Sequence, residues 1–205
     1  HAHARVSSID PAAARAMPGV IAVYTVRELP ECARPIPPSV ASPAGFQTTV
    51  QPVFADPLVR YAGEVVAAVI ADDAYAAADA AAAVAVEYEP LPAAGTMEAA
   101  LESGAPRVFD GWPDNVAGLS TAKVGDPDAA FARAHLVVEA SLGLARIHGV
   151  PIETRGIVVT PEGPDGRLTL WTSSQSPYGL RGTVAAAFGL SDEQVRVVVV
   201  DTGGG

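Results

Sequence analysis

Two polar features in the last third of the chain stand where a protein could hold a ligand. Gln175 ends the apolar run "LTLWTSSQ", and Gly203, Gly204 and Gly205 follow the valine-rich run in "QVRVVVVDTGGG". A carboxamide offers one acceptor and two donors, and glycines leave backbone N–H groups open to a ligand. These groups suit an anionic or oxo-bearing cofactor. A solvated glutamine and a flexible glycine loop are the alternatives, and no GxGxxG motif leading into a helix is present.

The stretch "RIHGVPIETRG", residues 146–156, carries more ionisable side chains than a plain connection between strands. Glu153 and Arg155 point to the same side of an extended chain, so they can pair with each other or with neighbours. Glu153 is a candidate general base, but an ion pair that holds the loop is the simpler expectation. His148, a lone histidine, is more often structural than a ligand.

Other metal and nucleophile patterns are weak. His1 and His3 could chelate a metal from one face of a strand, but two histidines without a third ligand make a poor site. No Ser–His–Asp arrangement, P-loop or CxxC pair is visible. The single cysteine, Cys32, excludes a disulfide framework within these residues and fits a reducing compartment. We therefore expect a cytoplasmic protein, with the periplasm as the alternative.

The composition indicates a folded, acidic protein. Of 205 residues, 49% are hydrophobic and 18% are charged, which allows a sizeable core and argues against disorder. The formal net charge of -10 disfavours nucleic-acid binding. No apolar run reaches the roughly 18 residues that a membrane span needs. The chain begins without methionine, and it stops directly after a strand, so we expect both ends to be truncated.

The first 90 residues read as strands and two helices. Asp10 and Pro11 begin a helix that Pro18 and Gly19 end, and "VIAVYT" is a strand. Seven prolines between residues 30 and 57 indicate an extended loop. The strand "EVVAAVIA", an alanine-rich helix over 74–83 and the strand "VAVEYE" follow. We expect that unit to form a parallel or split β-α-β crossover.

Residues 91–125 are predicted to be a linker with one short helix, "TMEAALES". The pattern restarts at residue 126 with a capped helix, "DPDAAFARA", and a long alternating strand, "HLVVEASLGLARI". Two strands around the turn "GPDG" come next, then the helix "SPYGLRGTVAAAF" with Gly189 as its C-cap. Ser191 and Gln194 form a capping-box pattern before the valine strand.

Taken together, these motifs resemble the molybdopterin-binding large subunit of the molybdenum hydroxylases, which include xanthine dehydrogenase, aldehyde oxidase and aerobic carbon monoxide dehydrogenase. "HAHARVSSIDPAAARAMPGVIAVYTVRELP" and "VRYAGEVVAAVIADDAYAAADAAAAVAVEYEPLPA" look like the family's α/β-hammerhead domain. "GDPDAAFARAHLVVEA", "RIHGVPIETRG" and the stretch from "LTLWTSSQ" to "DTGGG" look like the start of its cofactor-binding domain. The resemblance implies a mixed α/β and α+β fold: the hammerhead over 1–90, a linker over 91–125 and a truncated cofactor-binding domain over 126–205.

The resemblance also implies a function. In the family, the glycines continue as Gly-Gly-Gly-Phe-Gly and their backbone approaches the metal centre, while the glutamine that hydrogen-bonds the metal's oxo ligand falls on Gln175. Cofactor-binding residues are then Gln175 and Gly203–Gly205, with no direct metal ligand. The family's glutamate base lies beyond these residues, so the fragment alone is expected to be inactive.

The implied reaction is hydroxylation of an aldehyde, an N-heterocycle or carbon monoxide, with oxygen taken from water. The implied cofactor is molybdenum-molybdopterin, in its cytosine dinucleotide form. Iron–sulfur clusters and FAD are expected on partner domains or subunits of a hetero-oligomer. A non-catalytic scaffold or assembly module of the same fold is the alternative.

Overall fold

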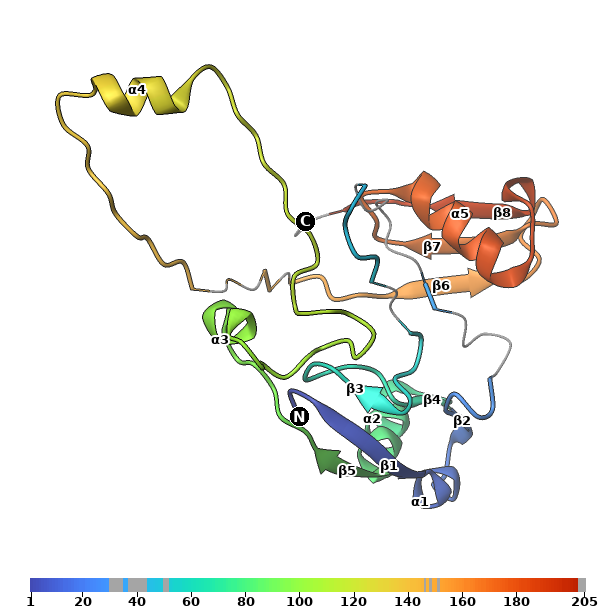
Figure 1. Ribbon diagram of the computed structural model, residues 1–205. Coiled ribbons are helices and arrows are strands. Elements are labelled where there is room, and N and C mark those ends of the chain that lie inside the picture. The colour runs from blue at the N-terminus through green and yellow to red at the C-terminus, as the bar shows by residue number, and fades with distance from the viewer. Residues whose placement is uncertain are drawn as a thin grey trace. The chain divides into compact units, whose positions relative to one another are not determined.

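The computed structural model describes residues 1–29, 35–36, 44–49, 52–145, 147, 149–150 and 152–202 (Figure 1). The chain separates into two units, His1–Gly118 and Leu119–Gly205. Within the described ranges, no helix combines the length and the apolar character needed to cross a lipid bilayer.

The first unit contains two antiparallel sheets. β1 (Ala4–Asp10) is the central strand of one sheet and lies between β3 (Leu58–Val59) and β5 (Ala85–Pro90). β2 (Val20–Tyr24) pairs with β4 (Ala68–Ala71) in the other. The predicted strands in these regions are therefore confirmed, although β4 is shorter than the sequence pattern indicated.

The expected β-α-β crossover is wrong. The helix over 74–83 does connect two strands, but β4 and β5 lie in different sheets and do not pair with each other. Each finds an antiparallel partner from the opening segment instead, β5 on β1 and β4 on β2. Local sequence shows that a strand precedes and follows the helix, but the partners are chosen by long-range pairing.

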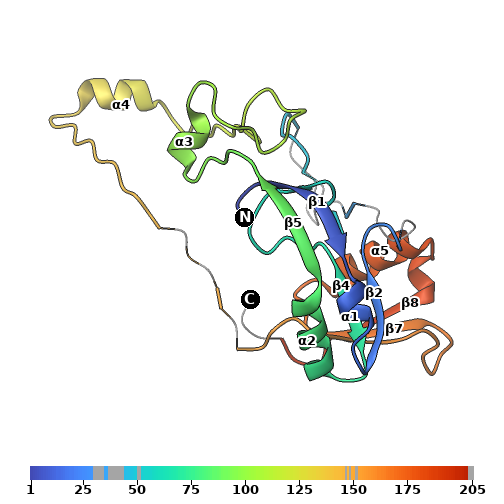
Figure 2. The same ribbon diagram turned by 90° about the horizontal axis from the view of Figure 1, so that it is seen from below.

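Two helices pack against the β2–β4 sheet. α2 (Ala74–Ala83) has the predicted bounds, and the Asp73 carboxylate accepts hydrogen bonds from the backbone N–H groups of its first turn at 2.8 and 2.9 Å. α1 (Ala12–Arg15) contacts α2, and Figure 2 shows the two helices side by side. Pro11 occupies the N-cap of α1, whereas Asp10 ends β1.

Small side chains make this packing close. The buried residues between the helices and the β2–β4 sheet are Ala14, Val23 and Ala80. A separate group of buried residues lies at the β1 sheet and consists of Ala4, Val6, Ala55 and Val59. Because most of these side chains are alanine or valine, the backbones approach one another closely and each core is thin.

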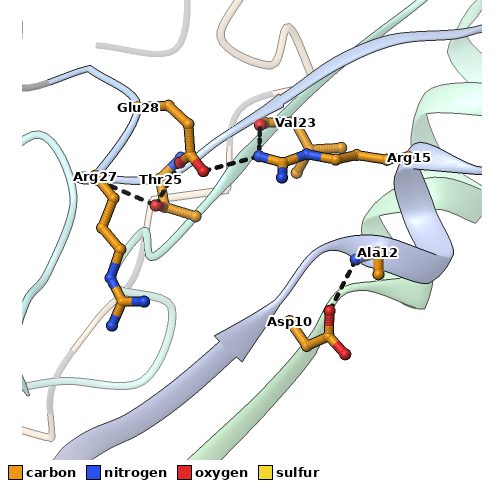
Figure 3. Close-up of polar contacts among 7 residues, drawn as sticks. All are labelled: Asp10, Ala12, Arg15, Val23, Thr25, Arg27 and Glu28. Atoms are coloured by element: carbon orange, nitrogen blue, oxygen red, sulfur yellow. Dashed lines mark hydrogen bonds and ion pairs between the residues drawn. The ribbon is translucent and has the colours of Figure 1, made fainter.

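A polar network joins α1 to the residues at and after the end of β2 (Figure 3). One Glu28 oxygen accepts from the backbone N–H and hydroxyl of Thr25 at 2.8 and 2.6 Å, and the other accepts from Arg15 at 2.8 Å. Arg15 also donates to the Val23 carbonyl at 2.8 Å. The Thr25 and Arg15 hydrogen bonds lower the pKa of Glu28 to about 2. The network ties α1 to the end of β2.

The predicted linker contains ordered structure. α3 (Met97–Leu101) begins after Thr96, whose hydroxyl accepts from the Ala99 N–H at 3.1 Å. The Asn115 side chain donates to the carbonyls of Ala100 and Pro106 at 3.1 and 3.0 Å and accepts from the Val108 N–H at 2.9 Å. Through these hydrogen bonds Asn115 holds the segment after α3 against the end of that helix, within the first unit.

The second unit contains a three-stranded sheet of mixed direction. Its strand order is β6 (Ile157–Thr160), β7 (Leu168–Thr172) and β8 (Val195–Val198), with β6–β7 antiparallel and β7–β8 parallel. α5 (Pro177–Phe188) connects the two parallel strands and packs on β8. The core between helix and sheet consists of Leu170, Ala185 and Val195.

The end of α5 follows the predicted signals. Gly189 takes a left-handed conformation with a φ of 67°, and the Leu190 N–H donates to the Ala185 carbonyl at 2.8 Å. A short 3-10 helix, η1 (Asp192–Gln194), then leads into β8 and carries the expected capping box between Ser191 and Gln194. The Gly189 and capping-box predictions are confirmed.

The long strand predicted from "HLVVEASLGLARI" is wrong. α4 (Pro127–Arg133) forms as expected, with Asp126 as its N-cap, but residues 136–145 after it belong to no helix or strand. Leu142 and Leu144 are both 91% exposed. An alternating sequence becomes a strand only when another strand supplies hydrogen-bond partners, and the described residues supply none here.

Candidate functional site

Gln175 lies just past the end of β7, on the edge where β8 also ends. The two strands are parallel, and Trp171 of β7 is the partner of Val198 of β8. The two strands therefore end at the same edge of the sheet. β7 leads to Gln175, and β8 leads to Thr202. The carboxyl ends of parallel strands are a frequent place for ligands, because the loops that follow them can converge.

A cavity of about 550 Å³ opens at this edge. Its lining brings together residues from four stretches of the chain, among them Glu153, Arg155, Ser173, Gln175, Leu180 and Thr202. This volume is in the range of small-molecule sites. The cavity therefore joins the loop after β7, the residues after β8 and the segment before β6.

Two hydrogen bonds hold the segment before β6 against the end of β7. The Ser173 hydroxyl donates to the Glu153 carboxylate, and the Thr172 hydroxyl donates to the Gly156 carbonyl at 2.9 Å. Of the two alternatives, Glu153 therefore bonds to a neighbour, and it does so through a hydrogen bond, because the ion pairs of the described residues do not include Glu153 or Arg155. Fixing this segment also fixes one wall of the cavity.

Three of the described side chains that line the cavity can donate hydrogen bonds to a ligand. Gln175 contributes a carboxamide, Arg155 a guanidinium and Thr202 a hydroxyl. The Ser173 and Thr172 hydroxyl protons are taken by Glu153 and Gly156, and Glu153 is the one carboxylate among the described residues of the lining. Leu180 of α5 adds an apolar contact. A guanidinium, a carboxamide and a hydroxyl suit an oxyanion or an oxo-bearing group better than they suit a bare metal cation.

The structure places the other candidate residues apart from this cavity or does not describe them. His1 packs against the Tyr88 ring with centroids 5.1 Å apart, and the Nδ1 atom of His3 lies 3.0 Å from the Pro92 carbonyl oxygen, both in the first unit. Gly203–Gly205 and His148 lie outside the described residues. Over the part of the chain that is described, no three His, Cys, Asp or Glu residues form a metal-binding group.

Sequence reasoning did not single out Ser173 and Thr202. Ser173 stands two residues before Gln175 in "WTSSQ", and Thr202 precedes the glycines in "DTGGG". Hydroxyl residues at the ends of two apolar strands were the available signal. That Ser173 and Thr202 line one cavity cannot be predicted from the sequence unless β7 and β8 are known to be neighbours.

Two family models match successive parts of the chain. A family model of the aldehyde oxidase and xanthine dehydrogenase a/b hammerhead domain matches residues 1–92, and a model of the molybdopterin cofactor-binding domain matches residues 108–205. The chain belongs to the molybdenum hydroxylase family. Its fold is therefore a hammerhead domain followed by the beginning of a cofactor-binding domain, as the motifs indicated.

Individual relatives support the same family. The chain is 36% identical to the carbon monoxide dehydrogenase large chain of Afipia carboxidovorans, covering 100% of this chain and 26% of the relative. It is 34% identical to the nicotine 6-hydroxylase large subunit of Paenarthrobacter nicotinovorans, covering 100% and 25%. The solved quinoline 2-oxidoreductase of Pseudomonas putida 86 superposes with a TM-score of 0.88 at 39% identity, covering 100% and 26%. The chain spans about a quarter of the length of these relatives.

Proposed function

We propose that this chain forms part of the large subunit of a molybdenum-dependent hydroxylase, which oxidises an aldehyde, an N-heterocycle or carbon monoxide with oxygen from water. The observation that carries the proposal is the cavity shared by Gln175 and Thr202 in the part of the chain that matches a molybdopterin cofactor-binding domain. The relatives named above include proteins that act on carbon monoxide and on nicotine.

The residues of the cavity fit such a cofactor. A molybdenum-molybdopterin group carries oxo and phosphate oxygens, and the cavity supplies the Gln175 carboxamide, the Arg155 guanidinium and the Thr202 hydroxyl, which can donate to oxygens. When bound, the group would supply a metal that accepts two electrons from the substrate. In this proposal Gln175 would donate to an oxo oxygen of the group, and the backbone N–H groups of Gly203–Gly205 would also bind the cofactor.

The role of Gln175 would be electrostatic and positional. A donor already in place where negative charge grows needs no reorganisation during the reaction. Leu180 and the apolar part of the cavity would limit the access of water, which strengthens such a hydrogen bond. Glu153 is bonded to Ser173 and is not assigned the proton-transfer role. That role is assigned to a glutamate outside these residues.

The finer points of the proposal extend to the whole protein. We assign the cytosine dinucleotide form of the cofactor, and iron–sulfur clusters and FAD on partner domains or subunits of a hetero-oligomer. The carbon monoxide dehydrogenase and nicotine 6-hydroxylase relatives are themselves named as a large chain and a large subunit, which supports a multi-subunit assembly. We place the protein in the cytoplasm, with the periplasm as the alternative, and cell fractionation distinguishes the two.

The test uses the full-length protein that carries this chain. Metal analysis should find molybdenum in stoichiometric amount, and Gln175→Ala should lower kcat about 10²-fold, as does the removal of one donor from an oxyanion site. Gln47→Ala, a glutamine of the first unit, is the matched control and should leave turnover unchanged. A full-length protein free of molybdenum would overturn the proposal and favour the scaffold alternative.

A further inference from the structure

A second cavity in the same unit is lined by three arginines. Its volume is about 290 Å³, and it shares no lining residue with the cavity at Gln175. Arg167 stands just before β7, Arg181 lies on α5 and Arg196 lies on β8. The fold therefore brings guanidinium groups from three separate elements to one hollow, in a chain whose net charge is -10.

These arginines are only partly neutralised. Asp165 accepts from Arg167 at 2.7 Å and lies 3.5 Å from Arg196, while Asp192 accepts from Arg181 at 3.1 Å. Hydrogen bonds from Arg167 lower the pKa of Asp165 to about 2, so this aspartate is ionised at neutral pH. Three cations face two anions, and neither aspartate lines the cavity itself.

Arg181 retains an unused donor. Its Nη2 atom bonds to Asp192, but its Nε atom is buried and has no hydrogen-bond partner in the structure. A buried donor without an acceptor costs free energy, so this guanidinium has hydrogen-bonding capacity that the described contacts do not use. The guanidinium also lies 5.6 Å from the centre of the Tyr178 ring, which holds it in place over an aromatic face.

The start of α5 adds to the positive potential. Pro177 and Tyr178, its first two residues, line the cavity, and the Ser176 side chain makes no capping hydrogen bond. The first turn of a 12-residue helix carries partial positive charge on its free N–H groups. Val195, Val197 and Val199 also belong to the lining, although Val195 is buried in the core between α5 and the sheet. Charged and apolar groups therefore line one hollow.

We propose that this cavity binds a small phosphate-bearing molecule, with its phosphate against Arg167, Arg181 and Arg196 and its organic part against Tyr178 and Val199. Guanidinium groups recognise phosphate oxygens in pairs, which favours a phosphate over a halide. The cavity is several times larger than the roughly 30 Å³ that one water occupies in the liquid, so it can take more than a bare phosphate. The site is independent of the function proposed at Gln175.

The test measures binding of inorganic phosphate and of phenyl phosphate to the full-length protein by calorimetry, at constant ionic strength set with chloride. Both should bind saturably, and phenyl phosphate should bind several-fold more tightly because its ring can contact Tyr178. Arg196→Gln should weaken both by about tenfold or more. Arg133→Gln removes the same charge from an exposed position on α4 and should change neither.

Arg181→Lys provides a second variant if Arg196→Gln does not fold, as judged by circular dichroism. It keeps the charge but removes the planar guanidinium that can donate two hydrogen bonds to one phosphate, so phosphate binding should weaken while the overall charge stays the same. Binding that is equal in all variants, or no saturable binding beyond that seen with chloride, overturns the proposal. Tight binding of inorganic phosphate with no gain for phenyl phosphate overturns the assignment of an organic part.

Discussion

At the scale of single residues, the candidate site depends on a few hydrogen bonds that join distant parts of the chain. Ser173 donates to Glu153 across 20 positions of sequence, and Thr172 donates to the Gly156 carbonyl. Both contacts lie next to Gln175 at the edge of the β7–β8 sheet. A segment that precedes β6 is therefore held at the cavity that Gln175 lines.

We predict an energetic coupling between Glu153 and Ser173. In the full-length protein, Glu153→Gln and Ser173→Ala should each lower the free energy of unfolding, and the double variant should lose less than the sum of the two. The coupling should be about 0.5–1 kcal/mol, because the hydrogen bond is exposed to solvent. Denaturant unfolding of the four proteins measures it, and strictly additive losses would contradict the contact.

A second residue-scale prediction concerns Glu28 and pH. The folded state holds the pKa of Glu28 near 2, below its ordinary value of 4.5, so its contribution to stability is complete above about pH 4.5 and is lost as the pH falls toward 2. Glu28→Gln should lower the free energy of unfolding by about 1 kcal/mol at pH 7, a modest figure because the carboxylate is partly exposed.

The difference between wild type and Glu28→Gln should shrink between pH 5 and pH 2. Urea unfolding across this range measures it. Glu98→Gln, which changes a carboxylate on α3 that forms no ion pair within the described residues, is the matched control and should show no comparable difference. A difference for Glu28→Gln that persists unchanged at pH 2 would rule out the network as its cause.

At the scale of elements, α5 links the two parallel strands whose ends form the candidate site. Its bounds follow from strictly local chemistry: Pro177 at the first turn and Gly189 at the end. Its packing onto β8 through Ala185 is a tertiary fact. If α5 began or ended at a different residue, β8 would begin at a different residue as well. Thr202 would then lie at a different position relative to Gln175.

Two glycines of this region should respond to alanine in opposite ways. Gly189 has a φ of 67° with open space where a Cβ would lie, so Gly189→Ala should cost about 1 kcal/mol from backbone strain alone. Gly182 lies inside α5 with a normal helical conformation, and the nearest atom to an added Cβ is Asp192 Oδ1 at 4.0 Å. Gly182→Ala should therefore stabilise by about 0.5–1 kcal/mol. Chemical denaturation of both variants checks the sign, and losses of equal size would be inconsistent with this account.

At the scale of the molecule, large apolar side chains remain exposed. Leu142 and Leu144 are 91% exposed, Ile147 is 88% exposed and Ile152 is fully exposed. The cores are small, with few large buried side chains among the described residues. A chain with thin cores and exposed apolar segments has little margin of stability on its own.

We predict that the 205-residue chain alone unfolds broadly at low temperature and binds a hydrophobic dye. The double change Leu142→Ser and Leu144→Ser should reduce dye binding without lowering the melting temperature, because these exposed side chains contribute no core packing. Leu170→Ser, at a buried position in the second unit, should abolish folding of that unit. A sharp, high-temperature melt of the unmodified chain would contradict this prediction.

Elements with local signals could be predicted from the sequence. The Asp73 cap, the bounds of α2, the turn before β7, Gly189 and the Ser191 capping box all depend on residues within one or two turns of each other. The family resemblance rests on the order of such motifs, and the matches to both domain models confirm it. Two predictions failed, the crossover around α2 and the strand after α4, because each required knowledge of a distant pairing partner.

The sequence alone therefore determined the types of most elements and many of their ends, and it singled out Gln175 as a candidate. Tertiary structure decided that β7 and β8 are neighbours and that Thr202 and Ser173 share a cavity with Gln175. It also decided that three arginines meet in a second cavity. The reason is physical. Caps and turns form from hydrogen bonds between residues that are close in sequence, so the local sequence predicts them. Strand neighbours and cavities form from contacts between residues that are far apart in sequence, and the local sequence does not specify those contacts.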